Sequence, residues 1–246
     1  MEKKEYYKHL LPHFQQPGQA YFITWILKDA IPPHALKRYT EKLEFLKTEI
    51  ARFGDQKCTG VRKFLTSGSI AVTNRDIHAT PNPELEILLK EYYSLRKKYI
   101  KVYDDLLAVQ ECGLINLLKP ELLLIISEAL LFWEGKRIEN IAFCIMSNHV
   151  HWVFRLKETD ENGKPVYLQD IMHSVKRHTA NQINKLTGEK GALWQKESFD
   201  TTIRDMEHEY NAVRYTLNNP VVAKLEQNWN AWPGSWCCKE YKNAGF

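Results

Sequence analysis

The sequence lacks the cysteine patterns of disulfide-bonded or zinc-binding proteins. Its 246 residues include five cysteines, an odd and scattered set in which no CxxC pair occurs. A disulfide framework needs paired cysteines, and a structural zinc site needs closely spaced ligands. We therefore expect reduced thiols and a cytoplasmic setting, because disulfides are rare in that compartment.

Long apolar runs are also missing. The most apolar segment, Leu122 to Trp133, contains Glu128 and is shorter than the roughly 20 residues that a membrane-spanning helix needs. The N-terminal stretch MEKKEYYKHLL is charged and lacks the apolar core of a signal peptide. These absences predict a protein with no membrane partner.

Neither sign of charge dominates the chain. Charged residues make up 26% of the sequence and hydrophobic residues 44%, which excludes a disordered protein and suits one large core. We therefore expect a single domain that spans residues 1–246. The net charge of +4 permits a polyanionic partner without requiring one. Seven tryptophans and twelve tyrosines could stack on unpaired bases, although most of them should pack in the core.

Hydrophobic periodicity predicts an alternation of strands and helices. The expected strands are residues 19–27, 141–146, 150–154 and 199–203, and the expected helices are residues 34–53, 83–101, 121–133, 168–186 and 206–218. This order indicates an α+β fold, a ferredoxin-like antiparallel sheet with helices on one side. The helices at about 33–119 form an insertion in the first crossover. The lack of periodicity in residues 55–82 predicts an irregular loop there. Pro220 should end the last helix.

Two histidines open the second strand of a predicted hairpin. His149 and His151 are separated by Val150, and Ser147-Asn148 is a plausible tight turn before them. Residues i and i+2 of a strand point to the same side, so both imidazoles would project from one face while Val150 packs into the other. The pair could bind a divalent metal, although two such histidines often have no function.

The last predicted helix carries a tyrosine and a carboxamide on one face. Tyr215 and Asn219 are four residues apart. Near the two histidines, the Asn219 oxygen could complete a site for Mg²⁺ or Mn²⁺, and Tyr215 could attack a phosphodiester. From the spacing alone, a tyrosine that only packs is the more common case. Tyr210 is the weaker nucleophile candidate, because Arg214 stands four residues after it.

These segments together resemble a known family. The stretch IAFCIMSNHVHWVFRL (141–156) resembles the HUH motif region of the single-tyrosine transposases. The runs LQDIMHSVKRHTANQIN (168–184) and GALWQKESFDTTIRDMEHEYNAVRYTLNNPVVAKL (191–225) are similar to the REP-associated tyrosine transposase branch. The resemblance implies a metal-dependent transposase with a ferredoxin-like fold. Such an enzyme cleaves and rejoins single-stranded DNA through a 5′-phosphotyrosine and recognises DNA hairpins.

The resemblance also assigns roles to residues. His149 and His151 match the metal histidines, Asn219 matches the third ligand and Tyr215 matches the nucleophile. We further expect a positive face to hold the DNA backbone, with a tryptophan stacking on a base. The residues expected to bind DNA are Lys176, Arg177, Lys185, Arg204, Trp152 and Trp194. The insertion could serve hairpin recognition, homodimer formation or neither.

Three alternatives stay open at this point. A replication or plasmid-transfer nickase would use the same chemistry, but a chain of 246 residues has little room for an added helicase or primase domain. A domesticated hairpin-binding protein would no longer cut DNA, and the intact set of histidines, tyrosine and asparagine argues against it. A small-molecule metalloenzyme would need a concave apolar pocket.

Overall fold

The computed structural model describes residues 6–8, 12–14, 16–31, 35, 37–55, 83–108, 115–196 and 198–246. The chain divides into two compact units, one formed by residues 1–30 and 110–246 and the other by residues 31–109. The second unit covers most of the range in which we expect the insertion. Nearly all of the predicted loop at 55–82 lies outside the described residues.

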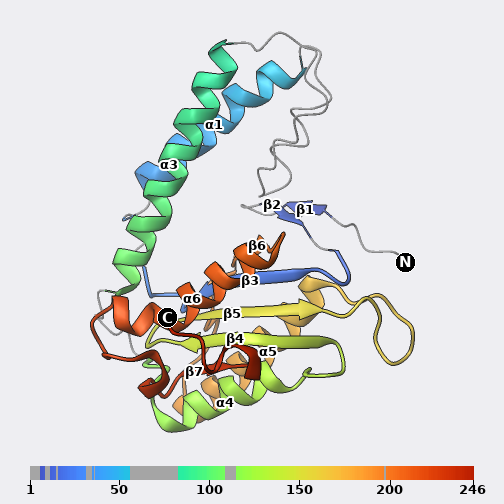
Figure 1. Ribbon diagram of the computed structural model, residues 1–246. Coiled ribbons are helices and arrows are strands. Elements are labelled where there is room, and N and C mark those ends of the chain that lie inside the picture. Colours follow the sequence, from blue (N-terminus) through green and yellow to red (C-terminus); the bar gives the residue numbers. More distant parts are fainter. Residues whose placement is uncertain are drawn as a thin grey trace. The chain divides into compact units, whose positions relative to one another are not determined.

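The first unit is built on a five-stranded antiparallel sheet with the order β6-β3-β5-β4-β7 (Figure 1). Its strands are β3 (Ala20–Ile26), β4 (Ile138–Ile145), β5 (His149–Leu156), β6 (Phe199–Thr202) and β7 (Ser235–Cys237). Two short N-terminal strands, β1 (Tyr6–Lys8) and β2 (Pro12–Phe14), pair with each other in a separate sheet. The sequence did not predict β1, β2 or β7.

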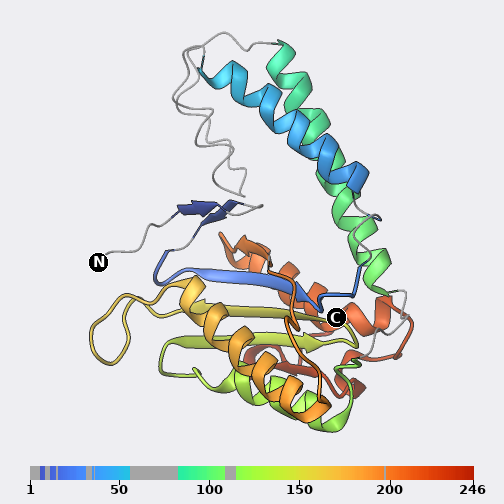
Figure 2. The same ribbon diagram turned by 180° about the vertical axis from the view of Figure 1, so that it is seen from behind.

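Three helices accompany this sheet: α4 (Pro120–Leu131), α5 (Leu168–Thr187) and α6 (Met206–Val222). The chain runs β3, α4, β4, β5, α5, β6, and these four strands lie in the order fourth, first, third, second. This arrangement confirms the predicted α+β, ferredoxin-like sheet. Helices α4 and α5 pack together on one face, as expected, and Figure 2 shows α5 in front of the strands.

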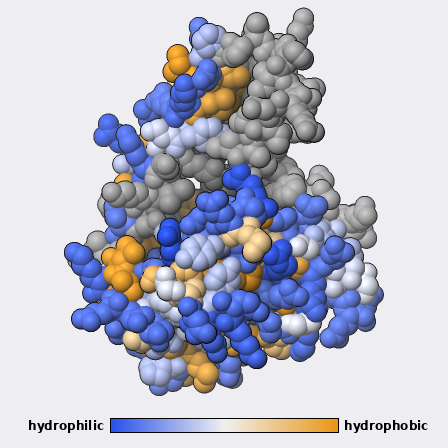
Figure 3. Space-filling model, in the orientation of Figure 1, coloured by the Kyte–Doolittle hydropathy of each residue, from blue (hydrophilic) through white to orange (hydrophobic). Residues whose placement is uncertain are grey.

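Helix α6 packs on the opposite face of the sheet, where we expected no helix. Strand alternation explains why this second face is also apolar. The larger side chains, among them Trp25 and Trp152, point toward α4 and α5. The α6 face carries smaller residues such as Val153, which pack with Val213 and Leu217 of α6. In the view of Figure 3, the surface of this unit is mainly hydrophilic with small, separate hydrophobic areas.

Helix ends follow local chemistry, with one exception. Gly188 ends α5 with a φ of 76°, a left-handed conformation that glycine adopts without a steric penalty. Asp205 caps α6, because its side chain accepts the backbone N–H of His208 at 2.7 Å. The prediction that Pro220 ends α6 is wrong, since the helix continues to Val222. The carbonyl of Pro220 accepts the N–H of Leu225, and this bond closes the last turn of the helix.

The second unit consists of two helices, α1 (Lys37–Asp55) and α3 (Pro83–Ala108). They bury Leu46, Ile50 and Tyr103, and an exposed ion pair joins Lys42 to Glu91 at 2.8 Å. Helix α3 continues seven residues beyond its predicted end at residue 101. Among the described residues, no helix has the length and apolar character to cross a membrane.

The C-terminal stretch that follows α6 packs against the sheet. A 3-10 helix, η1 (Trp229–Ala231), leads into β7, and a second, η2 (Lys239–Tyr241), follows it. Gly234 lies where a larger residue would not fit, because an added Cβ would come within 2.2 Å of the Ile145 carbonyl oxygen. The close approach lets β7 pair with β4 at the edge of the sheet.

Candidate active site

A buried two-residue turn places the histidines. Ser147 and Asn148 connect β4 to β5, and the N–H of Met146 donates to the carbonyl of His149 at 2.9 Å. The carbonyls of Ser147 and Asn148 accept the N–H groups of Leu117 and Leu27. His149 and His151 therefore begin β5 at a fixed position, and strand alternation points both side chains to the face covered by α6.

Each imidazole is held by a polar side chain at Nδ1. Thr24 of β3 lies directly opposite His151 in the strand register, and its Oγ1 is 2.7 Å from His151 Nδ1. The Asn148 Oδ1 is 2.6 Å from His149 Nδ1. On the other side of the ring, Asn219 Nδ2 of α6 is 3.0 Å from His151 Nε2. Helix α6 thus reaches the histidines through its carboxamide.

An aromatic cluster brings Tyr215 to the same place. The ring of Phe22 stacks on His151 with centroids 5.8 Å apart, and the two rings of the histidine pair are 4.7 Å apart. Tyr215 meets Phe22 and His151 edge-on, at centroid distances of 5.6 and 5.3 Å. His149 and His151 are 2% and 1% exposed, whereas Tyr215 is 38% exposed. The phenol can therefore meet a large substrate beside the buried imidazoles.

Burial keeps both imidazoles neutral. It lowers the pKa of His149 to about 3, although a hydrogen bond with Asn219 partly opposes the shift. Burial also lowers the pKa of His151 well below its ordinary value, and the neighbouring His149 adds to this effect. A neutral imidazole keeps one nitrogen lone pair, which is what a metal ligand requires.

The side chains present fit a divalent metal bound by two imidazoles and a carboxamide. Within the described part of the chain, no group of three or more His, Cys, Asp and Glu residues could hold a metal, so a carboxamide would have to be the third ligand. Asn219 contacts both histidines. Two nitrogens and one amide oxygen leave positions for phosphate oxygens, and this donor set is acceptable to Mn²⁺.

The two tryptophans expected to stack on a base lie in the core instead. Trp152 is 0% exposed, and its Nε1 donates to Asn140 Oδ1 at 2.6 Å. Trp194 is 6% exposed, and its Nε1 donates to Thr179 Oγ1 at 2.9 Å. Both pack edge-on against Trp25. We therefore correct the expectation, because neither indole face is open to a DNA base.

The basic residues of α5 lie on the other face of the sheet from the histidines. Lys176 donates to the carbonyls of Gln195 and Lys196, so it anchors the loop before β6. Arg177 and Lys185 are exposed on α5, which covers the face opposite α6. DNA bound along α5 would therefore be separated from Tyr215 by the sheet. The expectation that these basic residues hold the DNA backbone stays a prediction.

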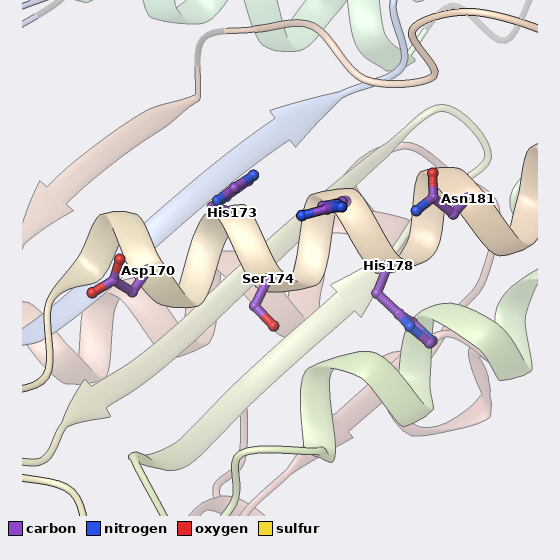
Figure 4. A pocket seen from close by; sticks show the side chains of 6 residues that line it. Asp170, His173, Ser174, His178 and Asn181 are labelled. Carbon is purple, nitrogen blue, oxygen red and sulfur yellow. The ribbon is translucent and has the colours of Figure 1, made fainter.

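A shallow hollow of about 350 Å³ also lies on α5. Its lining side chains all project from this one helix (Figure 4). They are Asp170, His173, Ser174, Arg177, His178 and Asn181. Because the hollow is polar and lies away from the histidines, it is not part of the candidate site.

Arginines near α6 are better placed than those of α5. Arg204 is exposed just before the N-cap of α6, roughly 16 Å along the helix axis from Tyr215. Arg214 is exposed next to Tyr215, and its guanidinium lies 6.0 Å from the centroid of the Tyr210 ring. Arg155 of β5 pairs with Glu209 of α6 at 2.8 Å. Arg214 and Arg155 were not predicted as site residues.

Sequence reasoning also missed the neighbours of the histidines. Asn148 directly precedes the histidine pair, and this position in the sequence could have indicated that it contacts His149. Thr24 is an isolated polar residue in an otherwise apolar strand, and Phe22 lies two residues before it. Their partnership with His151 depends on the pairing of β3 with β5, which no local pattern predicts.

The chain aligns with a known sequence relative and with a solved structure. No family model matches the chain. A protein of Haemophilus influenzae named "Putative REP-associated tyrosine transposase" is 28% identical over 106 residues, which is 42% of this chain and 60% of that relative. The chain thus matches less than two thirds of the relative's length.

The solved structure is that of a REP-associated tyrosine transposase bound to a REP hairpin. It aligns over 91% of this chain and 79% of its own, with 14% identity and a TM-score of 0.39. The family resemblance therefore depends on the sequence match and the motifs. On that basis, the chain is similar in sequence to the REP-associated tyrosine transposases.

Proposed function

We propose that this protein is a metal-dependent DNA strand transferase of the single-tyrosine HUH class. It would cleave and rejoin single-stranded DNA through a 5′-phosphotyrosine intermediate. One observation carries the proposal: Tyr215 and Asn219 of α6 meet His149 and His151 of β5 on one face of the sheet. These are the four side chains that such chemistry needs, and they come from two separate elements.

The arrangement suits attack on a phosphodiester. Tyr215 Oη would bond to phosphorus and the bond from phosphorus to the 3′ oxygen would break, which leaves the 5′ side on the tyrosine and releases a 3′-hydroxyl. The phenol loses one proton and the 3′ oxygen gains one, so protons balance. Attack by a 3′-hydroxyl on the phosphotyrosine reverses the step and rejoins a strand.

His149, His151 and Asn219 would hold the metal, Mg²⁺ or Mn²⁺. When bound, the metal would polarise the phosphodiester and stabilise the charge of the transition state. Asn219 would have to turn its carboxamide, because its Nδ2 now faces His151 Nε2 and an oxygen is the ligand atom. Arg214 directly precedes Tyr215 on α6 and is exposed, and it would contact the DNA backbone.

The proposed substrate is single-stranded DNA that carries a hairpin. This part of the proposal comes from the motif resemblance and from the relative's name, which refers to an association with REP. Contacts of the exposed Arg204 and Arg214 with phosphates should make binding weaken as salt rises, because such contacts release counterions.

An adduct experiment tests the proposal. Single-stranded DNA with a hairpin from beside the protein's own gene, labelled at its 3′ end, is incubated with Mn²⁺ and separated on a denaturing gel. We expect a labelled protein–DNA adduct with the unmodified protein. The adduct should disappear in Tyr215→Phe and when a chelator removes the metal.

Tyr210→Phe is the matched control. Tyr210 lies on the same helix and is 40% exposed, close to the exposure of Tyr215, but it packs against Phe246 rather than the histidines. This variant should keep the adduct. An adduct that survives Tyr215→Phe but not Tyr210→Phe would contradict the assignment. Hairpin binding without an adduct in any metal would instead support a domesticated binder that no longer cuts.

A further inference from the structure

We propose that Thr24 and Asn148 are positioning residues, which hold His151 and His149 as Nδ1–H tautomers so that each ring presents its Nε2 to the metal. This inference deepens the proposed function and rests on it for the metal. Neither residue would touch the substrate. Each would act through the imidazole that it contacts.

The tautomer of His149 follows from its partner. The Asn148 atom beside His149 Nδ1, at 2.6 Å, is the carboxamide oxygen, which can only accept a hydrogen bond. The proposal places the hydrogen of this ring on Nδ1, where it is donated to Asn148, rather than on Nε2, where it would serve the hydrogen bond with Asn219. In a neutral imidazole only one nitrogen is protonated, so His149 Nε2 keeps its lone pair. Asn148 is 4% exposed, so water does not compete effectively for this bond.

Two bonds fix the tautomer of His151 from opposite sides. Asn219 Nδ2 can only donate, and it lies 3.0 Å from Nε2, so Nε2 must accept. Nδ1 then carries the hydrogen and donates to Thr24 Oγ1 at 2.7 Å. Thr24 is 5% exposed and stands opposite His151 on the neighbouring strand, so the sheet itself holds the acceptor in place.

The arrangement matters because a histidine ligand is strengthened by a hydrogen bond at its other nitrogen. That bond fixes the ring orientation and raises the basicity of the ligating nitrogen, and its removal typically weakens metal binding about 10- to 100-fold. The wrong tautomer would present an N–H to the metal in place of a lone pair. Thr24 comes from β3 and Asn148 from the hairpin turn, so two separate elements prepare one donor pair.

The first test measures the tautomers in the metal-free protein, by the ¹⁵N chemical shifts of the histidine ring nitrogens. We expect both His149 and His151 to show the Nδ1–H form. Because the Asn219 donor also favours this form at His151, the comparison is made in Asn219→Ala. In that background Thr24→Val, which keeps the shape but removes the acceptor, should give a mixture of tautomers at His151 alone. Thr24→Ser keeps the hydroxyl and should restore the original form. An unchanged His151 spectrum in the folded variant with both Asn219→Ala and Thr24→Val would overturn the proposal.

The second test measures Mn²⁺ affinity by titration calorimetry. Thr24→Val should bind Mn²⁺ about 10- to 100-fold more weakly, whereas Thr24→Ser should stay close to the unmodified protein. Asn148→Asp keeps an acceptor and should bind Mn²⁺ with an affinity close to that of the unmodified protein. Asn148→Leu lacks an acceptor and should bind Mn²⁺ more weakly. Equal affinities for Thr24→Val and Thr24→Ser would also count against the proposal. If Thr24→Val fails to fold, the Asn148 pair gives the same comparison at His149.

The two tests separate this inference from the proposed function. The tautomers are read without metal or DNA, so they can be right even if the protein forms no adduct. Failure of the unmodified protein to bind Mn²⁺, with Nδ1–H tautomers observed, would remove the metal from the proposed function. If the protein binds Mn²⁺ but its histidines are Nε2–H tautomers, the metal stays in the proposed function and the role given to Thr24 and Asn148 is overturned.

Discussion

At the scale of single residues, burial separates two kinds of aromatic side chain. Tyr215 is 38% exposed and meets the histidines, whereas Trp194 is 6% exposed and donates a hydrogen bond into the core. Both are large aromatic residues in segments that resemble the same family, so residue type alone does not distinguish them. The position of the polar group distinguishes them. A buried indole N–H normally has a fixed acceptor, whereas the Tyr215 ring is partly exposed.

Trp194→Phe tests this structural role. The change removes the bond from Nε1 to Thr179 Oγ1 but keeps an aromatic ring against Trp25. Thr179 still donates to the carbonyl of Val175, so its hydroxyl is not left without a partner. We expect the free energy of unfolding to fall by about 1 kcal/mol, measured by urea denaturation.

Binding of hairpin DNA should be unchanged in Trp194→Phe, including its dependence on salt. Because a phenyl ring could still stack on a base, binding should also be unchanged in folded Trp194→Leu. Arg214→Ala is the comparison. Because Arg214 is exposed and directly precedes Tyr215, its removal should lower the affinity for hairpin DNA and flatten the salt dependence of binding. A large loss of affinity in folded Trp194→Leu would contradict the core assignment and restore the stacking role.

At the scale of elements, the sequence predicted the sheet and its helices better than it predicted which side chains are accessible. Alternation in β5 put both histidines on one face, and the same rule puts Trp152 on the face of Val150, in the core. The expectation that Trp152 stacks on a base overlooked this rule. Local pattern, applied consistently, would have excluded that residue.

Other features depend on tertiary structure and have no local signal. The three residues of β7 become a strand because they pair with β4, and Thr24 becomes a partner of His151 through the register of β3 and β5. Pro220 was expected to end α6, yet the helix continues because later N–H groups bond to the carbonyls of its last turn. The site could be predicted in its four main residues, but not in the residues that orient them.

Helix α6 provides an element-scale prediction, because it carries both Tyr215 and Asn219. Asp205 accepts the N–H of His208 and satisfies one of the first donors of the helix. Asp205→Ala should lower the free energy of unfolding by about 1 kcal/mol, and thermal and urea denaturation would measure it. Asp205→Asn keeps the acceptor and should lose less.

The cap lies far from the chemistry, so the Asp205 variants should still form the DNA adduct at a temperature where they are folded. Equal stability of Asp205→Ala and the unmodified protein would show that the cap contributes nothing. Loss of the adduct in folded Asp205→Ala would show that the start of α6 positions Tyr215 in a way that the hydrogen bonds do not reveal.

At the scale of the whole molecule, the first unit contains its own core. Both clusters of buried residues that flank its sheet come from residues 20–30 and from residue 115 onward, within the described part of the chain. The candidate site draws on β3, β5 and α6, all of which belong to this unit. The side chains that form the candidate site therefore all come from one unit.

The two ends of this unit lie close together where the second unit is inserted. Leu27 and Leu117 donate to the adjacent carbonyls of Asn148 and Ser147, and Ala30 and Ile115 pack against the same core cluster. A flexible linker of about six Gly and Ser residues spans about 13 Å, and we expect it to join residue 30 to residue 115.

We therefore expect the chain with this linker in place of residues 31–114 to fold with a single cooperative transition and to bind Mn²⁺ with unchanged affinity. Circular dichroism on heating and calorimetry would measure the two properties. If folding and Mn²⁺ binding are kept but hairpin binding is lost, residues 31–114 recognise DNA. If hairpin binding and the adduct yield are kept as well, these residues serve another role. Loss of folding or of Mn²⁺ binding would show that the sheet and its histidines depend on the second unit, because a core that is complete by itself needs no support from an inserted pair of helices.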